Sequence, residues 1–171
     1  FTFTFTFVSG KNLEHKIYLT LKLFDNFYIS KLENTNLPPI ESASITMHKN
    51  QNYLTGGYIY DSNKSGVRSD KYYIQKNEFE FDGPYSMNTQ LNGHCSISFK
   101  EKLFILGGYN GLEFVNDIYI YSEDNKIGFV PFSKAPFAPR AFFGCVHFNN
   151  GILIFGGNGI EDQTWGDVWY T

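Results

Sequence analysis

The chain has 171 residues, a formal net charge of −3, and a composition with 19% aromatic and 18% charged side chains. The negative charge argues against a protein whose main task is to bind a nucleic-acid backbone. The sequence also holds no apolar run of roughly 18 residues, which a membrane-spanning helix would need. Abundant Phe and Tyr, together with 16 glycines, favour a β-rich protein that packs layers of aromatic side chains between turns.

The first 37 residues are predicted to form three strands. Residues 1–8 and 16–23 alternate apolar and polar side chains, a period of two that is typical of strands with one buried face. A third short strand is expected over residues 27–32. Two prolines at positions 38 and 39 then close the segment, because proline cannot donate a hydrogen bond to a sheet. These strands match the last three of a four-stranded unit.

Three further units repeat one pattern. An apolar strand ends in Gly-Gly, a polar loop follows, and the next strand opens with an acid and, two residues later, an aromatic side chain. The glycine pairs begin at residues 56, 107 and 156, so they recur 51 and 49 residues apart, and a fixed period near 50 indicates a repeat architecture. The predicted strands are 43–48, 52–60, 70–76 and 78–81, then 93–99, 102–109, 116–122 and 127–132, then 144–148, 151–157 and 167–170. The structural residues of the repeat are Gly56, Gly57, Asp70, Tyr72, Gly107, Gly108, Asp117, Tyr119, Gly156, Gly157, Asp167 and Trp169.

Units of this kind predict a β-propeller. Four short antiparallel strands build one twisted sheet, and successive sheets must cover each other's faces, which radial packing around an axis achieves. Glycine has no Cβ, so the paired glycines are expected to leave room for rings from a neighbouring sheet. Tyr72, Tyr119 and Trp169 occupy matching positions and are predicted to hold one sheet against the next.

The pattern of Gly-Gly, acid and aromatic resembles the Kelch repeat over Ser9 to Tyr170. The first unit departs from it, with Ser9-Gly10 for the glycine pair and Lys16 in place of the acid, while Arg140 falls where many Kelch repeats place an arginine. The resemblance implies an all-β, Kelch-type β-propeller, here an arc of about two full and two partial four-stranded antiparallel blades. The expected division is a partial blade over 1–37, blades over 38–86 and 87–136, and a partial blade over 137–171. Propellers usually close with 4–8 blades, so the remaining blades are expected from the rest of a longer chain.

The two cysteines, Cys95 and Cys145, have no C-x-x-C spacing and are too few for a disulfide framework. They are predicted to be unpaired, buried side chains. Together with the lack of a leader in this stretch, unpaired cysteines favour an intracellular location.

No catalytic residue, metal site or cofactor is predicted. The glycine loops lack the Gly-Lys-Ser/Thr ending of a phosphate loop, the four histidines share no metal spacing, and no nucleophile motif is present. Residues 61–66 have the oxygen spacing of a calcium loop, but Tyr72 stands where the bidentate Glu belongs. A loop insertion is the preferred interpretation of this segment, with calcium binding as the alternative.

The Kelch resemblance implies that the loops after each glycine pair and the loops between blades share one face. Aromatic and arginine side chains on such loops suit protein binding. The predicted partner-binding residues are Tyr109, Asn110, Glu113, Phe114, Phe137, Arg140, Asn158, Glu161, Asp162 and Trp165. For Phe114 and Trp165, the alternative is that their rings only cover the blade beneath.

These features predict a non-catalytic protein–protein interaction platform that binds a partner protein, and neither nucleic acid nor a membrane, through loops on one face. The alternative is a carbohydrate-binding or carbohydrate-modifying Kelch-like enzyme of the oxidase or epimerase type. An oxidase would need a copper site with a crosslinked tyrosine and cysteine, for which the sequence has no motif. The loop acids and Arg140 are the features that support a sugar site.

Overall fold

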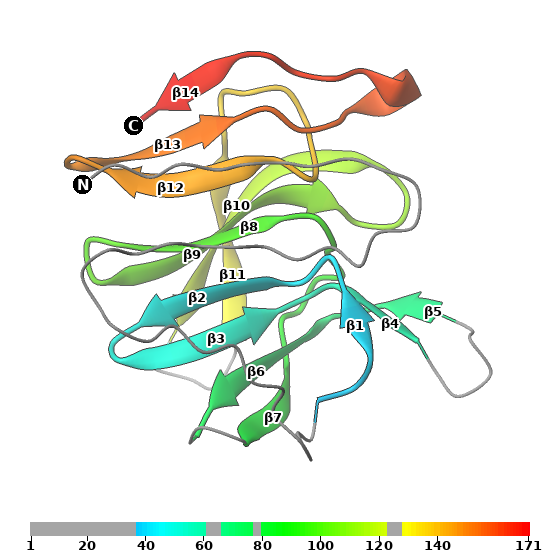
Figure 1. Ribbon diagram of the computed structural model, residues 1–171, viewed down its shortest axis with the longest axis vertical. Coiled ribbons are helices and arrows are strands. Elements are labelled where there is room, and N and C mark those ends of the chain that lie inside the picture. The colour runs from blue at the N-terminus through cyan, green and yellow to red at the C-terminus, as the bar shows by residue number, and fades with distance from the viewer. Residues whose placement is uncertain (1–36, 61–65, 77–79, 123–127) are drawn as a thin grey trace, which may run out of the picture. The chain divides into compact units, whose positions relative to one another are not determined.

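The computed structural model describes residues 37–60, 66–76, 80–122 and 128–171 (Figure 1). All of these belong to one structural unit, residues 34–171. The strands predicted over residues 1–36 lie outside the described residues, as do residues 61–65 of the candidate calcium loop.

The described residues form strands and a single 3₁₀ turn, without an α-helix. The strands are β1 (Ile40–Glu41), β2 (Ser44–His48), β3 (Gln51–Thr55), β4 (Tyr58–Tyr60), β5 (Gly66–Arg68), β6 (Lys71–Gln75), β7 (Phe81–Ser86), β8 (Cys95–Phe99), β9 (Lys102–Tyr109), β10 (Phe114–Ser122), β11 (Gly128–Lys134), β12 (Gly144–Phe148), β13 (Gly151–Phe155) and β14 (Val168–Tyr170), and the turn is η1 (Ile160–Asp162). Accordingly, no helix in these parts of the chain is long and apolar enough to cross a bilayer.

Three sheets follow one another along the chain, in the strand orders β2-β3-β6-β7, β11-β10-β9-β8 and β12-β13-β14. Every pairing within them is antiparallel. Strand β8 contacts β2 of the preceding sheet and β12 of the following one. These sheets confirm the predicted all-β class and its four-stranded antiparallel units, and they are called here the β2–β7, β8–β11 and β12–β14 blades.

One predicted strand is divided between two sheets. The strand expected over residues 52–60 ends as β3 at Thr55, and β4 joins a separate three-stranded sheet in the order β1-β4-β5. The cause is the glycine pair, since Gly56 and Gly57 have φ angles of +56° and +97°. This left-handed backbone turns the chain out of the blade, and only glycine adopts it without a steric cost.

Two apolar clusters lie between successive blades. The first contains Tyr53, Tyr72, Met87 and Leu91 of the β2–β7 blade and its connecting segment, with Leu103, Ile105, Val115 and Phe129 of the β8–β11 blade. The second contains Cys95, Ile97, Leu106, Ala135 and Phe137, with Phe143, Ile152 and Ile154. Tyr72 is 3% exposed, and its ring meets those of Tyr121 and Phe129 edge-on at centroid distances of 5.7 and 5.5 Å. Tyr119 and Trp169 pack partly buried against the first and second cluster, respectively.

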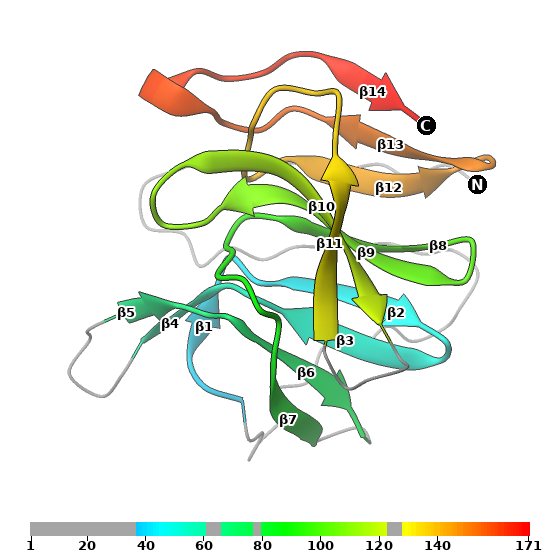
Figure 2. The ribbon, with the colours of Figure 1, turned by 180° about the vertical axis from the view of Figure 1, so that it is seen from behind.

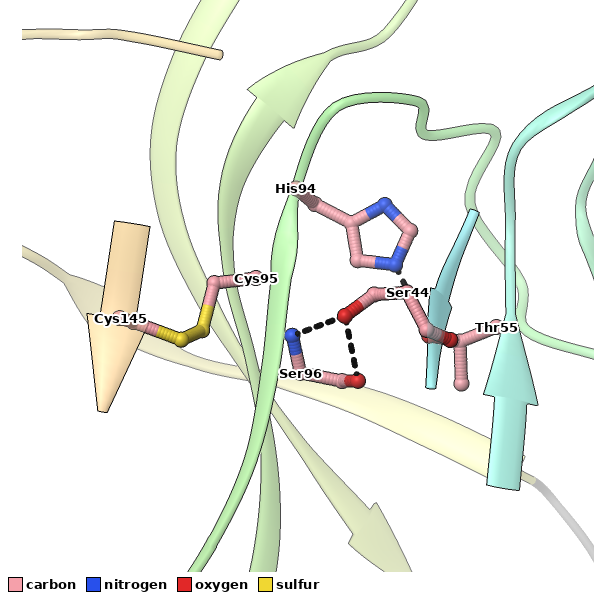
Figure 3. The surroundings of a disulfide bond; sticks show 6 residues. All are labelled: Ser44, Thr55, His94, Cys95, Ser96 and Cys145. Atoms are coloured by element: carbon pink, nitrogen blue, oxygen red, sulfur yellow. Dashed lines mark hydrogen bonds between the residues drawn. A yellow bond between two sulfur atoms is a disulfide. The ribbon is translucent and has the colours of Figure 1, made fainter. Parts of the chain in front are cut away.

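Strand β8 turns alternate side chains toward its two neighbours. Cys95 forms a disulfide with Cys145 of β12, with their Cα atoms 6.2 Å apart. Ser96 points the other way (Figure 3) and donates its backbone N–H and its hydroxyl to Ser44 Oγ of β2, at 2.9 and 2.7 Å. Because successive side chains of a strand point to opposite faces, one strand meets a covalent link on one side and a hydroxyl pair on the other.

The prediction of unpaired cysteines is therefore wrong. Cys95 and Cys145 are 50 residues apart, about one repeat, and lie on the first strands of adjacent blades. Their registers differ by one residue, because Cys95 pairs with Leu106 and Cys145 with Ile154, so the two side chains point toward each other. Neither their number nor local spacing reveals this proximity. The intracellular location that was inferred from unpaired cysteines loses that premise.

The first glycine of a pair accommodates a ring from the next blade. A Cβ placed on Gly56 would lie 2.5 Å from His94 Cε1, and one on Gly107 would lie 2.9 Å from Phe143 Cε1. Gly156 has no such neighbour in the described residues, where the nearest atom is Trp165 O at 3.8 Å. The expected role of the glycines is thus seen wherever a following blade is described.

Both end blades carry apolar side chains on their outward faces. On β2, Ile45 and Met47 are 59% and 65% exposed. In the β12–β14 blade, Ile152 and Ile154 are buried on one face of the sheet. The other face carries the exposed apolar side chains Val146, Phe148, Phe155, Val168 and Tyr170. Large apolar surfaces are normally covered. This arrangement supports the expectation, which stays a proposal, that further blades complete the propeller.

Replacing Cys95 and Cys145 together with Ala should lower the free energy of unfolding by about 2–4 kcal/mol, because the bond closes a long loop in the unfolded chain. Urea denaturation of the full-length protein without reductant measures the change. Dithiothreitol should bring the wild type close to the variant. A wild-type curve that reductant leaves unmoved would contradict the disulfide.

Replacing Gly107 with Ala should lower the free energy of unfolding by about 2–4 kcal/mol. The new Cβ would lie 2.9 Å from the Phe143 ring and 3.0 Å from Arg140 O, at a φ of +57°, so steric overlap adds to backbone strain. Gly166 is the matched control, because nothing lies within 4 Å of its Cβ position and its φ is not left-handed. Equal denaturation midpoints for the two Ala variants would disprove the packing role of Gly107.

Candidate functional site

The candidate site is the end of the blades at which the loops after the glycine pairs emerge. Figures 1 and 2 show the β4–β5 hairpin, the β9–β10 loop and the turn between β13 and β14 on the same side. We call residues 109–114, 137–142 and 158–165 the loop face, because these three segments hold the predicted partner-binding residues.

Backbone hydrogen bonds join the three segments of the loop face into a row. Tyr109 exchanges hydrogen bonds with Asn92, at 2.9 and 3.1 Å, and Ala141 does so with Asn158, at 2.9 and 2.8 Å. Between these two pairs, the N–H of Phe142 donates to Gly93 O at 2.7 Å. The segments are consequently neighbours in space.

Phe142 occupies an unusual backbone position. Ser42, Gly93 and Phe142 are spaced by one repeat, all have φ between +54° and +64°, and the N–H of each later one donates to the carbonyl of the one before. A left-handed backbone is unfavourable for a bulky side chain. Phe142 has this backbone although it is 54% exposed. Phe142 is not among the partner-binding residues predicted from the sequence. The signal that could have found it is its position, one repeat after Gly93.

The turn between β9 and β10 displays an exposed leucine on an ordered backbone. Asn110 Oδ1 accepts hydrogen bonds from the N–H groups of Leu112 and Glu113 at 2.8 and 2.9 Å. The rings of Tyr109 and Phe114, at the two ends of the turn, pack against each other with their centroids 5.1 Å apart. Leu112 is 91% exposed. It is also absent from the residues predicted from the sequence, which are mainly aromatic and polar.

Arg140 lies under the surface of the loop face, where it is 0% exposed. Its Nη2 donates to Asp167 Oδ2 at 2.8 Å, its Nη1 donates to Asp167 Oδ1 and to Gly156 O, and its Nε donates to Ala138 O at 3.1 Å. Asp167 accepts hydrogen bonds from Arg140 and, at 2.7 Å, from Trp169 Nε1. These hydrogen bonds lower the pKa of Asp167 to about 2. Such a bidentate pair binds loop to strand.

Two aromatic rings enclose the guanidinium group of Arg140. Its central carbon is 5.3 Å from the ring centroid of Phe137 and 5.0 Å from that of Trp165, distances at which a cation is attracted to a ring face. Phe137 is 2% exposed. Thus Arg140 and Phe137, which were predicted to contact a partner, lie beneath the surface. The Trp165 ring, which is half-buried, lies against the guanidinium charge.

The turn between β13 and β14 presents an apolar side chain followed by two acids. Gly159 N–H donates to Gln163 O at 2.8 Å and Gln163 N–H donates to Ile160 O at 3.1 Å, which closes the turn. Ile160 is 62% exposed, and Glu161 and Asp162 are exposed as well, with left-handed backbones. The predicted residues Asn158, Glu161 and Asp162 therefore lie at the surface, as does Glu113.

His94 is a buried histidine between two blades. Its Nε2 is 2.9 Å from Thr55 Oγ1, whose hydroxyl donates to Ser44 O at 3.2 Å, so the imidazole N–H donates to the threonine oxygen. Its Nδ1 has no hydrogen-bond partner among the described residues. Burial lowers the pKa of His94 to about 4, because the charged imidazolium would lose its hydration. In the described residues no group of three or more His, Cys, Asp and Glu side chains could hold a metal ion.

Acidification should destabilise the protein through His94. The unfolded state binds a proton as the pH falls through about 6.5 while the folded state binds it only near 4, so stability is lost within this window, by about 3 kcal/mol at most. The control is His94→Phe, because Phe143 fills the equivalent position against Gly107 and cannot titrate. Urea denaturation between pH 7 and 5 should show a steeper loss for wild type. Parallel losses would contradict a neutral buried His94.

Comparison with known proteins finds similar segments in two much longer chains. Dynein alpha chain of the flagellar outer arm from Chlamydomonas reinhardtii is 31% identical over 78 residues, which is 44% of this chain and 2% of the relative. Rho GTPase-activating protein gacHH from Dictyostelium discoideum is 36% identical over 64 residues, which is 37% of this chain and 4% of the relative. This chain thus spans only a small part of either protein.

A family model also matches the chain. The family is described as Kelch motif, and the match covers residues 91–126. This segment holds the glycine pair Gly107-Gly108, the acid Asp117 and the aromatic Tyr119, and it includes β8, β9 and β10 of one blade. The resemblance seen in the sequence is confirmed for this segment, which carries a Kelch motif within a four-stranded antiparallel β-sheet.

Proposed function

We propose that this chain is a non-catalytic interaction module that binds a partner protein through its loop face. The observation that carries the proposal is the presence of exposed apolar side chains on hydrogen-bonded turns of one face. Leu112, Phe142 and Ile160 are 91%, 54% and 62% exposed. Their turns are held by the bonds of Asn110, Gly93 and Gly159. Ordered turns reduce the entropy lost on binding.

The partner-binding set follows from exposure. Glu113, Asn158, Glu161 and Asp162 remain in it as surface residues, and Tyr109, Asn110, Phe114 and Trp165 as partly exposed ones. Leu112, Phe142 and Ile160 are added, whereas Arg140 and Phe137 support the surface from below. The relatives agree with a module of this kind, since in each the similar segment is a few per cent of a protein named for something else.

The carbohydrate alternative loses one of its two supports. Arg140 was one of the features that supported a sugar site, and it is fully buried and paired with Asp167. The loop acids alone do not favour a sugar over a protein.

Replacing Leu112 and Ile160 together with Ser should weaken partner binding at least about tenfold, because exposed apolar side chains act as anchors in interfaces. The measurement is a quantitative pulldown from native cell extract with the full-length protein, read by mass spectrometry. Lys100→Ser with Lys102→Ser, at the opposite ends of the strands, is the control. Since the loop side chains are exposed, melting temperatures should stay within about 1 °C. An unchanged set of partners in the Leu112/Ile160 variant would remove the loop face from consideration.

A further inference from the structure

The exposed apolar side chains of the loop face form one row. Leu112 lies three residues after Tyr109, whose backbone is hydrogen-bonded to Asn92. Gly93 follows Asn92 in the chain and accepts a hydrogen bond from the N–H of Phe142. Ala141 is bonded to Asn158, two residues before Ile160. The turns that carry Leu112, Phe142 and Ile160 are thus linked in sequence by backbone bonds, so an extended segment of a partner could contact all three.

Acidic side chains accompany this row. Glu113 follows Leu112, and Glu161 and Asp162 follow Ile160, and all three acids are exposed. The three segments of the loop face contain no lysine, and their only arginine is Arg140, whose charge is buried against Asp167. Lys134, which precedes the second segment along the chain, pairs with Asp117 at 3.5 Å. Within these three segments, apolar side chains are therefore accompanied by acids whose charge no exposed basic side chain of the same segments offsets.

The opposite ends of the same strands carry side chains of both charges, since Glu101 lies there beside three lysines. Lys49 and Lys100 lie in the turns that join β2 to β3 and β8 to β9, and Lys102 begins β9. The acids of the loop face attract a basic ligand toward the loops.

From these observations we infer that the partner presents to the loop face an extended segment in which lysine or arginine side chains alternate with apolar ones. The basic side chains pair with Glu113, Glu161 and Asp162, and the apolar ones cover Leu112, Phe142 and Ile160. This inference rests on the proposed function and adds the chemical class of the partner to it.

The test pans a random dodecapeptide library against the full-length protein at low salt. Peptides recovered by the wild type should contain about threefold more lysine and arginine than the unselected library, together with an excess of apolar residues. The loop variant Glu113→Lys with Glu161→Lys should lose the basic excess. Glu80→Lys with Glu101→Lys is the matched control, because it changes the net charge equally at the opposite ends of the strands and should keep the excess.

Each outcome decides between the two proposals. Peptides without a basic excess, or an excess that the loop variant and the control lose equally, overturn the charge inference. If those peptides bind the wild type but not the Leu112→Ser with Ile160→Ser variant, the loop face remains the binding surface and only the partner class is wrong. If that variant recovers the same peptides as the wild type, both proposals fail.

Discussion

The packing of a ring against a left-handed glycine is the interaction on which the other features of this structure depend. Gly56 meets the His94 imidazole and Gly107 meets the Phe143 ring, each from the following blade. A Cβ at either glycine would occupy the space of the ring, and the positive φ would strain any other residue. Strand β3 ends just before Gly56, whereas Gly107 lies within β9, two residues before its end. Each glycine thus joins two blades close to the start of a loop.

The repeat supplies equivalent positions, but the chain uses them differently in its two described seams. Between β8 and β12 the link is the Cys95–Cys145 disulfide with an apolar cluster beside it. Between β2 and β8 it is the Ser44–Ser96 pair, with His48 and Ser98 bonded at 2.9 Å further along. Alternation along β8 permits this difference, because neighbouring residues of one strand face separate partners.

In the loop face, buried and half-buried side chains hold the loops, and exposed apolar ones extend into solvent. Arg140, Asp167 and Phe137 fasten the inter-blade segment from below, with Trp165 against the guanidinium. Leu112 and Ile160 extend into solvent from turns closed by their own hydrogen bonds. A buried, fully bonded arginine is well suited to the first role, since its five donors can join several carbonyl and carboxylate groups at once.

Much of this protein was determined by its sequence alone. The period of the glycine pairs indicates the repeat, the alternation of side chains indicates strands, and the acid and aromatic positions identify the Kelch repeat. These features are local, because φ preferences and side-chain alternation act within a few residues. What only the tertiary structure decided involves residues a repeat or more apart, or the depth of a side chain: the pairing of Cys95 with Cys145, the burial of Arg140, and the exposure of Leu112 and Phe142. The departure of β4 into its own sheet belongs here too. No local pattern encodes how two sheets face each other, so contacts across a seam become visible only when the sheets are packed.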